Sequence, residues 1–321
     1  MKILVISLSN LGDALLTYPA LHALWQSYPE GEFHLLVSPR TRELFESDPR
    51  VNQIWIWEKN ASILEQILLL ARFSQIGFDL VVDFKNSLIP LFIPGAKRAP
   101  LLRRPPSNGI HRAQAHLDLV TALGIPPSNG RMSLPFGPKE EAQIQVWLEA
   151  GRRPVVMVPG ARSHLKRWGA EKFAEVADRL IERDQAQILL VGEEQERPIA
   201  AEVKRRMRHP ATDLVGRTSI RELAALLTRV SLLVTNDSAC LHAAEVMEVP
   251  VVALFGPTDE KKYGPRNPRS VVIRRQLVCA PCERALCPYD HECMKWIPAD
   301  EVYSAAARVL QDSVHPELVE G

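Results

Sequence analysis

The chain has 321 residues, with 39 lysine and arginine residues against 38 aspartate and glutamate residues. This length has room for about two domains, and the formal net charge of +1 argues neither for nor against a nucleic-acid partner. No apolar run approaches the ~18 residues that a membrane-spanning helix needs. The opening MKILVISLSNLGDALL leads into Gly12 and Asp13 rather than into a signal-peptide cleavage site. We therefore expect a soluble, cytoplasmic protein.

The first half of the chain alternates between dense apolar runs and helical patterns. Strands are predicted at residues 2–8, 33–37, 53–57 and 80–84, and helices at residues 14–28, 41–45, 61–73 and 111–123. Pro19 lies inside the first helical pattern and predicts an irregularity there. The segment 126–140 is rich in proline, glycine and serine, as linkers are. A helix at 140–150 is expected to close this half.

Two polar segments of the first half are candidates for chemistry. Gly12 follows the first strand and permits a close backbone approach or a positive φ. Asp13 is either a helix cap or a base at the carboxyl edge of the sheet. A basic, loop-like segment at 94–108 is either a solvated surface or a contact for an anionic acceptor, since arginine forks match phosphate. Its four cations are Lys97, Arg98, Arg103 and Arg104.

The second half repeats the alternation. Strands are predicted from Pro154 and at residues 187–191, 213–216, 232–234 and 249–255; helices are predicted at residues 170–182, 196–207, 220–228 and 239–247. Strands that alternate with helices indicate parallel sheets. The sequence therefore predicts an α/β protein with two doubly wound domains, at 1–150 and 151–321.

Polar residues follow successive strands of the second half, and the carboxyl ends of parallel strands meet at one edge of a sheet. A nucleotide diphosphate at that edge needs a cation, helix N–H groups and an acceptor for ribose hydroxyls, which Lys166, the helix start at Ser238 and Glu194 supply. The alternative is that Asp237 and Ser238 simply cap a helix. No GxxxxGK[ST] loop is present and no GxGxxG follows the first strand, which disfavours P-loop chemistry and ordinary dinucleotide binding.

Four cysteines lie close together near the C-terminus, with His291 beside them. Their spacing, C-x2-C-x4-C-x5-C, is compatible with a small zinc site. The alternative is a compact loop with reduced or oxidised thiols and no ion. Because the segment 279–294 lies outside the motifs predicted for the sheet edge, any metal is expected to be structural. The four residues are Cys279, Cys282, Cys287 and Cys293.

Taken in order, several motifs resemble those of glycosyltransferase family 9, the lipopolysaccharide heptosyltransferases. The segment 9–16, SNLGDALL, resembles the family's opening motif, and 166–168, KRW, resembles its K-x-W before a helix. The segment 236–242, NDSACLH, resembles its [TV]-D-[ST]-G-x-x-H, although Ala239 stands where glycine is usual. The segment 255–259, FGPTD, resembles its [FY]-G-P-T-[DS].

The resemblance implies a GT-B fold, in which two Rossmann-like domains face each other across a cleft. The N-terminal domain would bind the acceptor and the C-terminal domain the nucleotide sugar. A last helix is predicted from residue 298 to 310. In the GT-B fold, such a C-terminal helix often crosses back to the first domain. The implied activity is inverting transfer of a heptose from ADP-heptose to a lipid A–Kdo acceptor of the lipopolysaccharide inner core. No metal would be needed for transfer, no nucleic acid is expected, and contact with the inner membrane would be transient.

The resemblance also implies roles for individual residues. Asp13 would be the general base, and Lys166 would steady the diphosphate leaving group. On the donor side, Glu194 would bind the ribose, Thr218 would lie beside the base, and Asp237 would contact the sugar hydroxyls. The remaining donor-binding residues are Gly12, Ser238, Ala239 and His242, the last of which would by itself be a packing histidine.

Two alternatives remain at this point. A nucleotide-sugar epimerase of GT-B type would use carboxylates of the same fold without an acceptor. A non-catalytic protein that binds sugar nucleotides or takes part in lipopolysaccharide assembly would retain its function when Asp13 is replaced.

Overall fold

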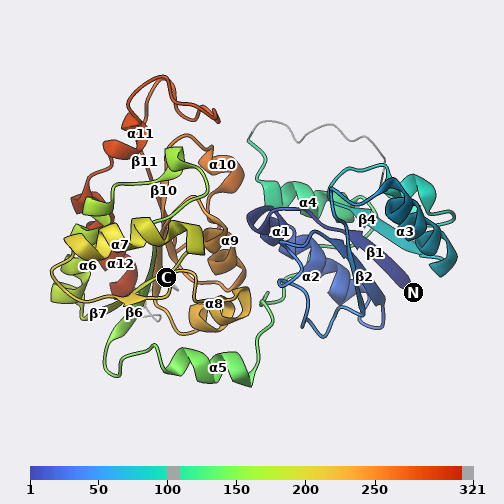
Figure 1. Ribbon diagram of the computed structural model, residues 1–321, viewed down its shortest axis with the longest axis horizontal. Coiled ribbons are helices and arrows are strands. Elements are labelled where there is room, and N and C mark those ends of the chain that lie inside the picture. Colours follow the sequence, from blue (N-terminus) through green and yellow to red (C-terminus); the bar gives the residue numbers. More distant parts are fainter. Residues whose placement is uncertain (100–108, 313–321) are drawn as a thin grey trace. The chain divides into compact units, whose positions relative to one another are not determined.

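The computed structural model describes residues 1–99 and 109–312 and divides the chain into two compact units, Met1–Pro135 and Phe136–Gly321 (Figure 1). The division comes earlier than the predicted boundary at residue 150 because helix α5 (Pro138–Gln145) packs on α8 (Ile220–Leu227) of the second unit. An ion pair between Glu140 Oε2 and Arg221 Nη2, 2.9 Å apart, joins the two helices.

The first unit is built on a five-stranded parallel sheet with the order β3-β2-β1-β4-β5. The first four strands coincide with the apolar runs of the sequence, whereas β5 is a pair of exposed charged residues in a segment predicted as a loop. The inner strands are almost completely buried, as parallel strands covered on both faces should be. The bounds are β1 Lys2–Ile6, β2 Glu32–Val37, β3 Gln53–Ile56, β4 Leu80–Asp83 and β5 Lys97–Arg98.

The helices of the first unit follow the predictions with one exception. The irregularity at Pro19 is confirmed: the predicted helix is interrupted at Thr17, and the proline lies in the first turn of the second helix. The helix predicted at 41–45 is wrong, because these residues form turns in which Thr41 bonds back to Ser38. The helical elements are α1 Leu11–Leu16, α2 Tyr18–Ser27, α3 Ile63–Ile76, the 3-10 turn η1 Ile89–Phe92 and α4 Arg112–Thr121.

The second unit is built on a six-stranded parallel sheet with the order β11-β10-β9-β6-β7-β8. Its outermost strand, β11, was not predicted. The strands are β6 Arg153–Val158, β7 Ala186–Leu190, β8 Thr212–Asp213, β9 Leu232–Asn236, β10 Val251–Phe255 and β11 Val271–Arg274. With the first unit, this confirms the predicted α/β class with two parallel sheets.

Helices cover both faces of this sheet (Figure 1). One layer contains α6 Ala170–Asp184, α7 Arg197–Arg206 and α12 Ala299–Asp312; the other contains α5, α8 and α9 Ala239–Val246. Short helical turns complete the unit: η2 His164–Lys166, η3 Glu194–Glu196, α10 Glu260–Tyr263 and α11 Glu292–Lys295.

The last helix, α12, belongs to the core of the second unit. It packs on α6, and Val302, Ala306 and Leu310 are buried in the same apolar cluster as Phe173. That the C-terminal helix crosses back to the first domain stays a prediction. Within the described ranges, no helix combines the length and the apolar character needed to cross a membrane.

Candidate functional site

The second sheet brings the predicted polar residues to one edge. Neighbouring strands from β6 to β11 are all parallel, so the loops after their carboxyl ends lie along the same side. Lys166 follows β6, Glu194 follows β7, Thr218 follows β8 and Asp237 follows β9. We call these loops, together with the loop after β10, the rim of the second unit.

A buried amide ties three segments of this rim together. Asn236, the last residue of β9, is fully buried. Its Nδ2 donates to the carbonyl oxygens of Pro159 and Gly160, at 2.9 and 3.2 Å, and its Oδ1 accepts from the backbone N–H of Trp168 at 3.1 Å. An amide has a donor on one side and an acceptor on the other, so it can satisfy both kinds of backbone group at once. The loop that carries Lys166 is thereby held against β9.

The next residue, Asp237, pairs with Lys166. Lys166 Nζ lies 2.6 Å from Asp237 Oδ2, and the aspartate side chain is 7% exposed while the lysine side chain is 33% exposed. The buried carboxylate therefore has a charged partner, as a buried ion requires. The ammonium keeps an open side toward solvent, where its remaining N–H groups can meet an anion.

The start of α9 differs from a simple cap. Ser238 is in the N-cap position, but its side chain makes no capping bond; its Oγ lies 3.0 Å from Thr235 Oγ1 instead. The carboxylate of Asp237 is occupied by Lys166. His242, also on this helix, is buried. Burial raises the pKa of Cys240 to about 12, so this thiol is un-ionised at neutral pH. Ala239 is the first residue of the helix.

Two glutamates of the loop after β7 have different surroundings. Glu194 is exposed and forms a two-point ion pair with Arg197, which lowers the pKa of the Glu194 carboxyl. Glu196 turns inward: a Cβ added to Gly160 or Gly192 would come within 3 Å of its carboxylate. Burial raises the pKa of Glu196, and one of its oxygens accepts from the backbone N–H of Glu193 at 2.9 Å. Spacing alone could not separate the two carboxylates, and the sequence analysis named only Glu194.

Thr218 lies half-buried in the loop before α8, next to the capping box formed by Ser219 and Glu222. Gly216 of the same loop has a φ of +69° and lies against Glu194, so a side chain there would be strained and would also collide. The loop after β8 therefore lies beside the loop after β7.

In the first unit, Asp13 is the third residue of α1, not its cap. Its Oδ2 accepts from Asn10 Nδ2 at 3.0 Å, and the residue is partly exposed beyond the carboxyl end of β1. Gly12 has a helical conformation, so the positive φ considered for it is not used. Asp13 is therefore positioned on a helix start, where the helix dipole favours a carboxylate.

The basic segment of the first unit is only partly described, because Arg103 and Arg104 lie outside the described residues. Lys97 Nζ donates to the carbonyl of Leu123 at 2.7 Å, and Arg98 donates to the carbonyls of Pro90 and Ile93. In this conformation both side chains bind backbone of their own unit.

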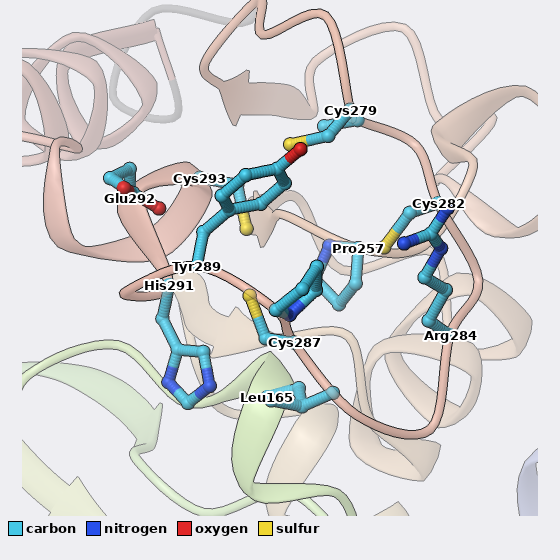
Figure 2. A pocket seen from close by; sticks show the side chains of 12 residues that line it. Leu165, Pro257, Cys279, Cys282, Arg284, Cys287, Tyr289, His291, Glu292 and Cys293 are labelled. Atoms are coloured by element: carbon cyan, nitrogen blue, oxygen red, sulfur yellow. The ribbon is translucent and has the colours of Figure 1, made fainter.

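The four cysteines line one pocket together with His291 (Figure 2). All four are free thiols. Leu165 and Pro257 also line the pocket, and the carbonyl of Pro257 accepts from the N–H groups of Cys282 and Glu283 at 3.0 and 2.8 Å. The segment is therefore close to the rim, although it contains none of the motifs predicted there. It packs against the loop after β10 and against the neighbour of Lys166.

The four sulfurs are not arranged as ligands of a common ion. Within residues 1–99 and 109–312, no three His, Cys, Asp or Glu side chains are grouped so that they could hold a metal. Zinc needs four ligands at about 2.0–2.3 Å. The donor set fits zinc by type, but binding would require the side chains to move.

Two Rossmann-like units in one chain, the second with a cation and a buried carboxylate at the rim of its sheet, are the architecture of a GT-B glycosyltransferase. A family model described as "Glycosyltransferase family 9 (heptosyltransferase)" matches residues 113–292, more than half of the chain. The protein therefore belongs to glycosyltransferase family 9.

Similar proteins agree with this assignment over nearly the whole chain. "Lipooligosaccharide heptosyltransferase 2" of Campylobacter jejuni is 28% identical over 324 residues, covering 98% of this chain and 99% of that protein. "Lipopolysaccharide heptosyltransferase 3" of Escherichia coli K12 is 25% identical and covers 94% and 96%. Among solved structures, "E. coli ADP-heptose lps heptosyltransferase II" matches with a TM-score of 0.79 at 23% identity, covering 98% and 100%. A family 9 glycosyltransferase from Veillonella parvula matches with a TM-score of 0.84 at 23% identity, covering 97% of each chain. At these identities the two structures support the fold.

Replacing Asn236 by alanine is expected to destabilise the second unit by about 3 kcal/mol, because a buried N–H and two carbonyl groups lose their partner. Urea unfolding, followed by circular dichroism, measures the loss. Asn267→Ala is the matched control: its amide donates to the carbonyl of Glu248 and accepts from the backbone N–H of Arg269, and both bonds are exposed to solvent, so their loss should cost less than about 1 kcal/mol. Equal losses in the two variants would contradict the bridging role of Asn236.

Proposed function

We propose that the protein is an inverting heptosyltransferase that transfers a heptose from ADP-heptose to a lipid A–Kdo acceptor of the lipopolysaccharide inner core. The observation that carries the proposal is the Lys166–Asp237 pair at the rim of the second unit, in a chain that belongs to family 9. The names of the curated relatives support the choice of sugar and acceptor.

On the donor side, the diphosphate would bind at the open side of the Lys166 ammonium and near the start of α9. When the sugar–phosphate bond breaks, negative charge develops on the leaving ADP, and a fixed cation stabilises that charge. Asp237 would hold the lysine in place and accept hydrogen bonds from sugar hydroxyls. Ser238, Ala239 and His242 would complete the diphosphate end, and Thr218 would border the adenine.

On the acceptor side, Asp13 would act as the general base. The acceptor hydroxyl oxygen attacks the anomeric carbon from the face opposite ADP, the bond from that carbon to the phosphate oxygen breaks with its electron pair leaving on ADP, and the hydroxyl proton passes to Asp13. The Asn10 side chain orients the carboxylate. Carboxylates in general are weak bases, so the proton would move late in the reaction. Gly12, also in the first turn of α1, would leave room for the donor sugar beside Asp13.

Asp13→Asn is expected to lower transfer about 10²–10⁴-fold, the usual contribution of a general base, while ADP affinity stays unchanged. Lys166→Ala should weaken both. Mass spectrometry of products formed from ADP-heptose and a panel of truncated lipopolysaccharide acceptors measures transfer, and calorimetry measures ADP binding.

Two results of the same experiment would refute the proposal. Isomerised nucleotide sugar formed without an acceptor would identify an epimerase. A binding protein would be identified if neither the parent nor Asp13→Asn transfers heptose and the variant still supports lipopolysaccharide assembly as well as the parent does.

The ribose partner is a choice between Glu194 and Glu196, and the surroundings favour Glu196. Glu194 is held by Arg197, whereas Glu196 lies between the glycines that follow β6 and β7, close to the rim. We expect Glu196→Gln to weaken ADP binding about tenfold and Glu194→Gln to change it by no more than about twofold. The reverse order would favour Glu194 in the role that the family resemblance implies.

The pKa of Glu196 gives this variant a second signature. Since burial raises this pKa above its ordinary value of 4.5, the ionised carboxyl is less favourable in the folded than in the unfolded chain. The stability that its protonated form contributes is present at low pH and is lost as the pH rises from 4.5 through the raised pKa. Glu196→Gln lacks this loss, so its melting temperature should match the parent at about pH 4 and exceed it at about pH 8.

As a separate proposal, Cys279, Cys282, Cys287 and Cys293 bind one structural zinc ion, which their spacing and common pocket support. Native mass spectrometry is expected to find one zinc per chain, retained by Cys240→Ser and lost by Cys282→Ser. A zinc-free protein whose four clustered thiols are all alkylated under native conditions would refute it.

A further inference from the structure

The turn after β2 is bonded to the loop that leads to Asp13, the proposed general base. Strands β1 and β2 are parallel neighbours (Figure 1), so the segments that follow them, residues 7–10 and 38–41, leave the sheet at the same edge. Two hydroxyl groups, those of Ser38 and Thr41, lie where these segments meet. The sequence predicted Thr41 to begin a helix and gave neither residue a role.

Thr41 orients the hydroxyl of Ser38. Thr41 is fully buried, and its Oγ1 accepts from the backbone N–H of Ser38 at 3.2 Å and lies 3.0 Å from Ser38 Oγ. The carbonyl oxygens of Leu8 and Ser38 are farther from Thr41 Oγ1, at 3.4 and 3.3 Å. A hydroxyl has one proton to donate, and the shorter contact directs the proton of Thr41 to Ser38 Oγ.

Ser38 connects this buried hydroxyl to the loop after β1. Its own Oγ donates to the carbonyl oxygen of Ser9 at 2.9 Å. The two hydroxyls therefore form a chain that runs in one direction, from Thr41 through Ser38 to the backbone of Ser9. The bonds of such a chain polarise and strengthen one another. One end of the chain is fixed by burial, and the other end holds a residue that is exposed.

The carbonyl of Ser9 belongs to the peptide unit that leads into Asn10. Asn10 is the N-cap residue of α1, and its backbone carbonyl accepts from the N–H of Ala14 at 2.9 Å. Its side chain donates to Asp13 Oδ2 at 3.0 Å. Fixing the peptide plane between Ser9 and Asn10 therefore fixes both the start of α1 and the donor that orients the carboxylate of Asp13.

We propose that Ser38 and Thr41 are positioning residues for the general base. They hold the loop between β1 and α1 so that the Asp13 carboxylate keeps the geometry that proton transfer needs, and they act through Asp13. This rests on the proposed function for the role of Asp13 and goes beyond it by assigning the residues that hold the base in place. A displacement of about 1 Å in a reacting group can lower a rate about 10²-fold, so a small movement of this loop is sufficient to matter.

The first test is transfer by the full chain from ADP-heptose to a truncated lipopolysaccharide acceptor. Ser38→Ala removes the bond to Ser9 and is expected to lower kcat about tenfold. The KM for ADP-heptose should stay within about twofold of the parent, because the proposed diphosphate contacts lie in the second unit. Ser38→Thr keeps the hydroxyl and should restore kcat to within about twofold of the parent.

Thr121→Ala is the matched control in the same unit. The Thr121 hydroxyl also donates to a carbonyl oxygen, that of Leu117 at 3.0 Å, but it lies in the last turn of α4. This variant should transfer like the parent, and thermal melting establishes that it and the Ser38 variants are folded. A Ser38→Ala protein with the parent kcat would overturn the proposal.

A double variant distinguishes positioning of Asp13 from a general structural role of the turn. If Ser38 acts through Asp13, adding Ser38→Ala to Asp13→Asn should leave the residual transfer unchanged, because no base remains to be positioned. The same tenfold loss in both backgrounds would show that Ser38 acts independently of Asp13 and would refute the proposal.

Hydrogen exchange followed by mass spectrometry measures the loop independently of activity. Amides of residues 7–14 should exchange about tenfold faster in Ser38→Ala than in the parent, whereas those of α6 in the second unit should be unchanged. A parent that transfers no heptose would refute the proposed function, and the exchange rates alone would then decide whether Ser38 holds the loop. Equal exchange of residues 7–14 in the two proteins would contradict that role.

Discussion

The rim of the second unit depends on one buried amide. Asn236 joins the end of β9 to the backbone after β6 and to the segment that carries Lys166, using the donor and the acceptor of a single side chain. The position of the Lys166 ammonium follows from this, because its loop is fixed on one side by Asn236 and on the other by the indole of Trp168, which donates to the carbonyl of Ile297 at 3.1 Å. The C-terminal segment therefore helps to position a residue that comes about 130 positions earlier in the chain.

The polar side chains of the two units are held in place to different degrees. In the second unit, a buried carboxylate is paired with its cation, which under the proposed function would keep the cost of reorganisation low when a diphosphate binds. In the first unit, Asp13 has one side-chain donor, Asn10, and stays partly exposed. Under the proposed function this difference is useful: a base that releases and receives protons would gain from access to solvent, whereas a cation that steadies a leaving group would gain from a fixed position.

Two features of the structure go beyond what the hydrophobic core requires. The outer side of α3 is apolar although the core needs only its inner side, and the cysteine segment packs on Pro257 rather than standing apart from the rim. Neither arrangement could be found from periodicity. A helix with apolar residues on most of its circumference predicts burial, and only the packing of Phe73 and Ile89 shows which side the core takes.

Local patterns of burial and backbone chemistry were enough to predict the two parallel α/β units, most strands, the irregularity near Pro19 and the order of polar residues after the strands. Tertiary structure alone decided that α5 belongs to the second unit, that residues 41–45 form turns, that β11 extends the sheet, and that Lys166 pairs with Asp237. It also separated Glu196, packed on Gly160 and Gly192, from Glu194, which binds Arg197. The packing of α5 on α8 and the pairing of Lys166 with Asp237 depend on contacts between residues distant in the chain, which spacing along a sequence does not encode. The turns at 41–45 and the different surroundings of Glu194 and Glu196 depend on local backbone geometry that residue types alone do not fix.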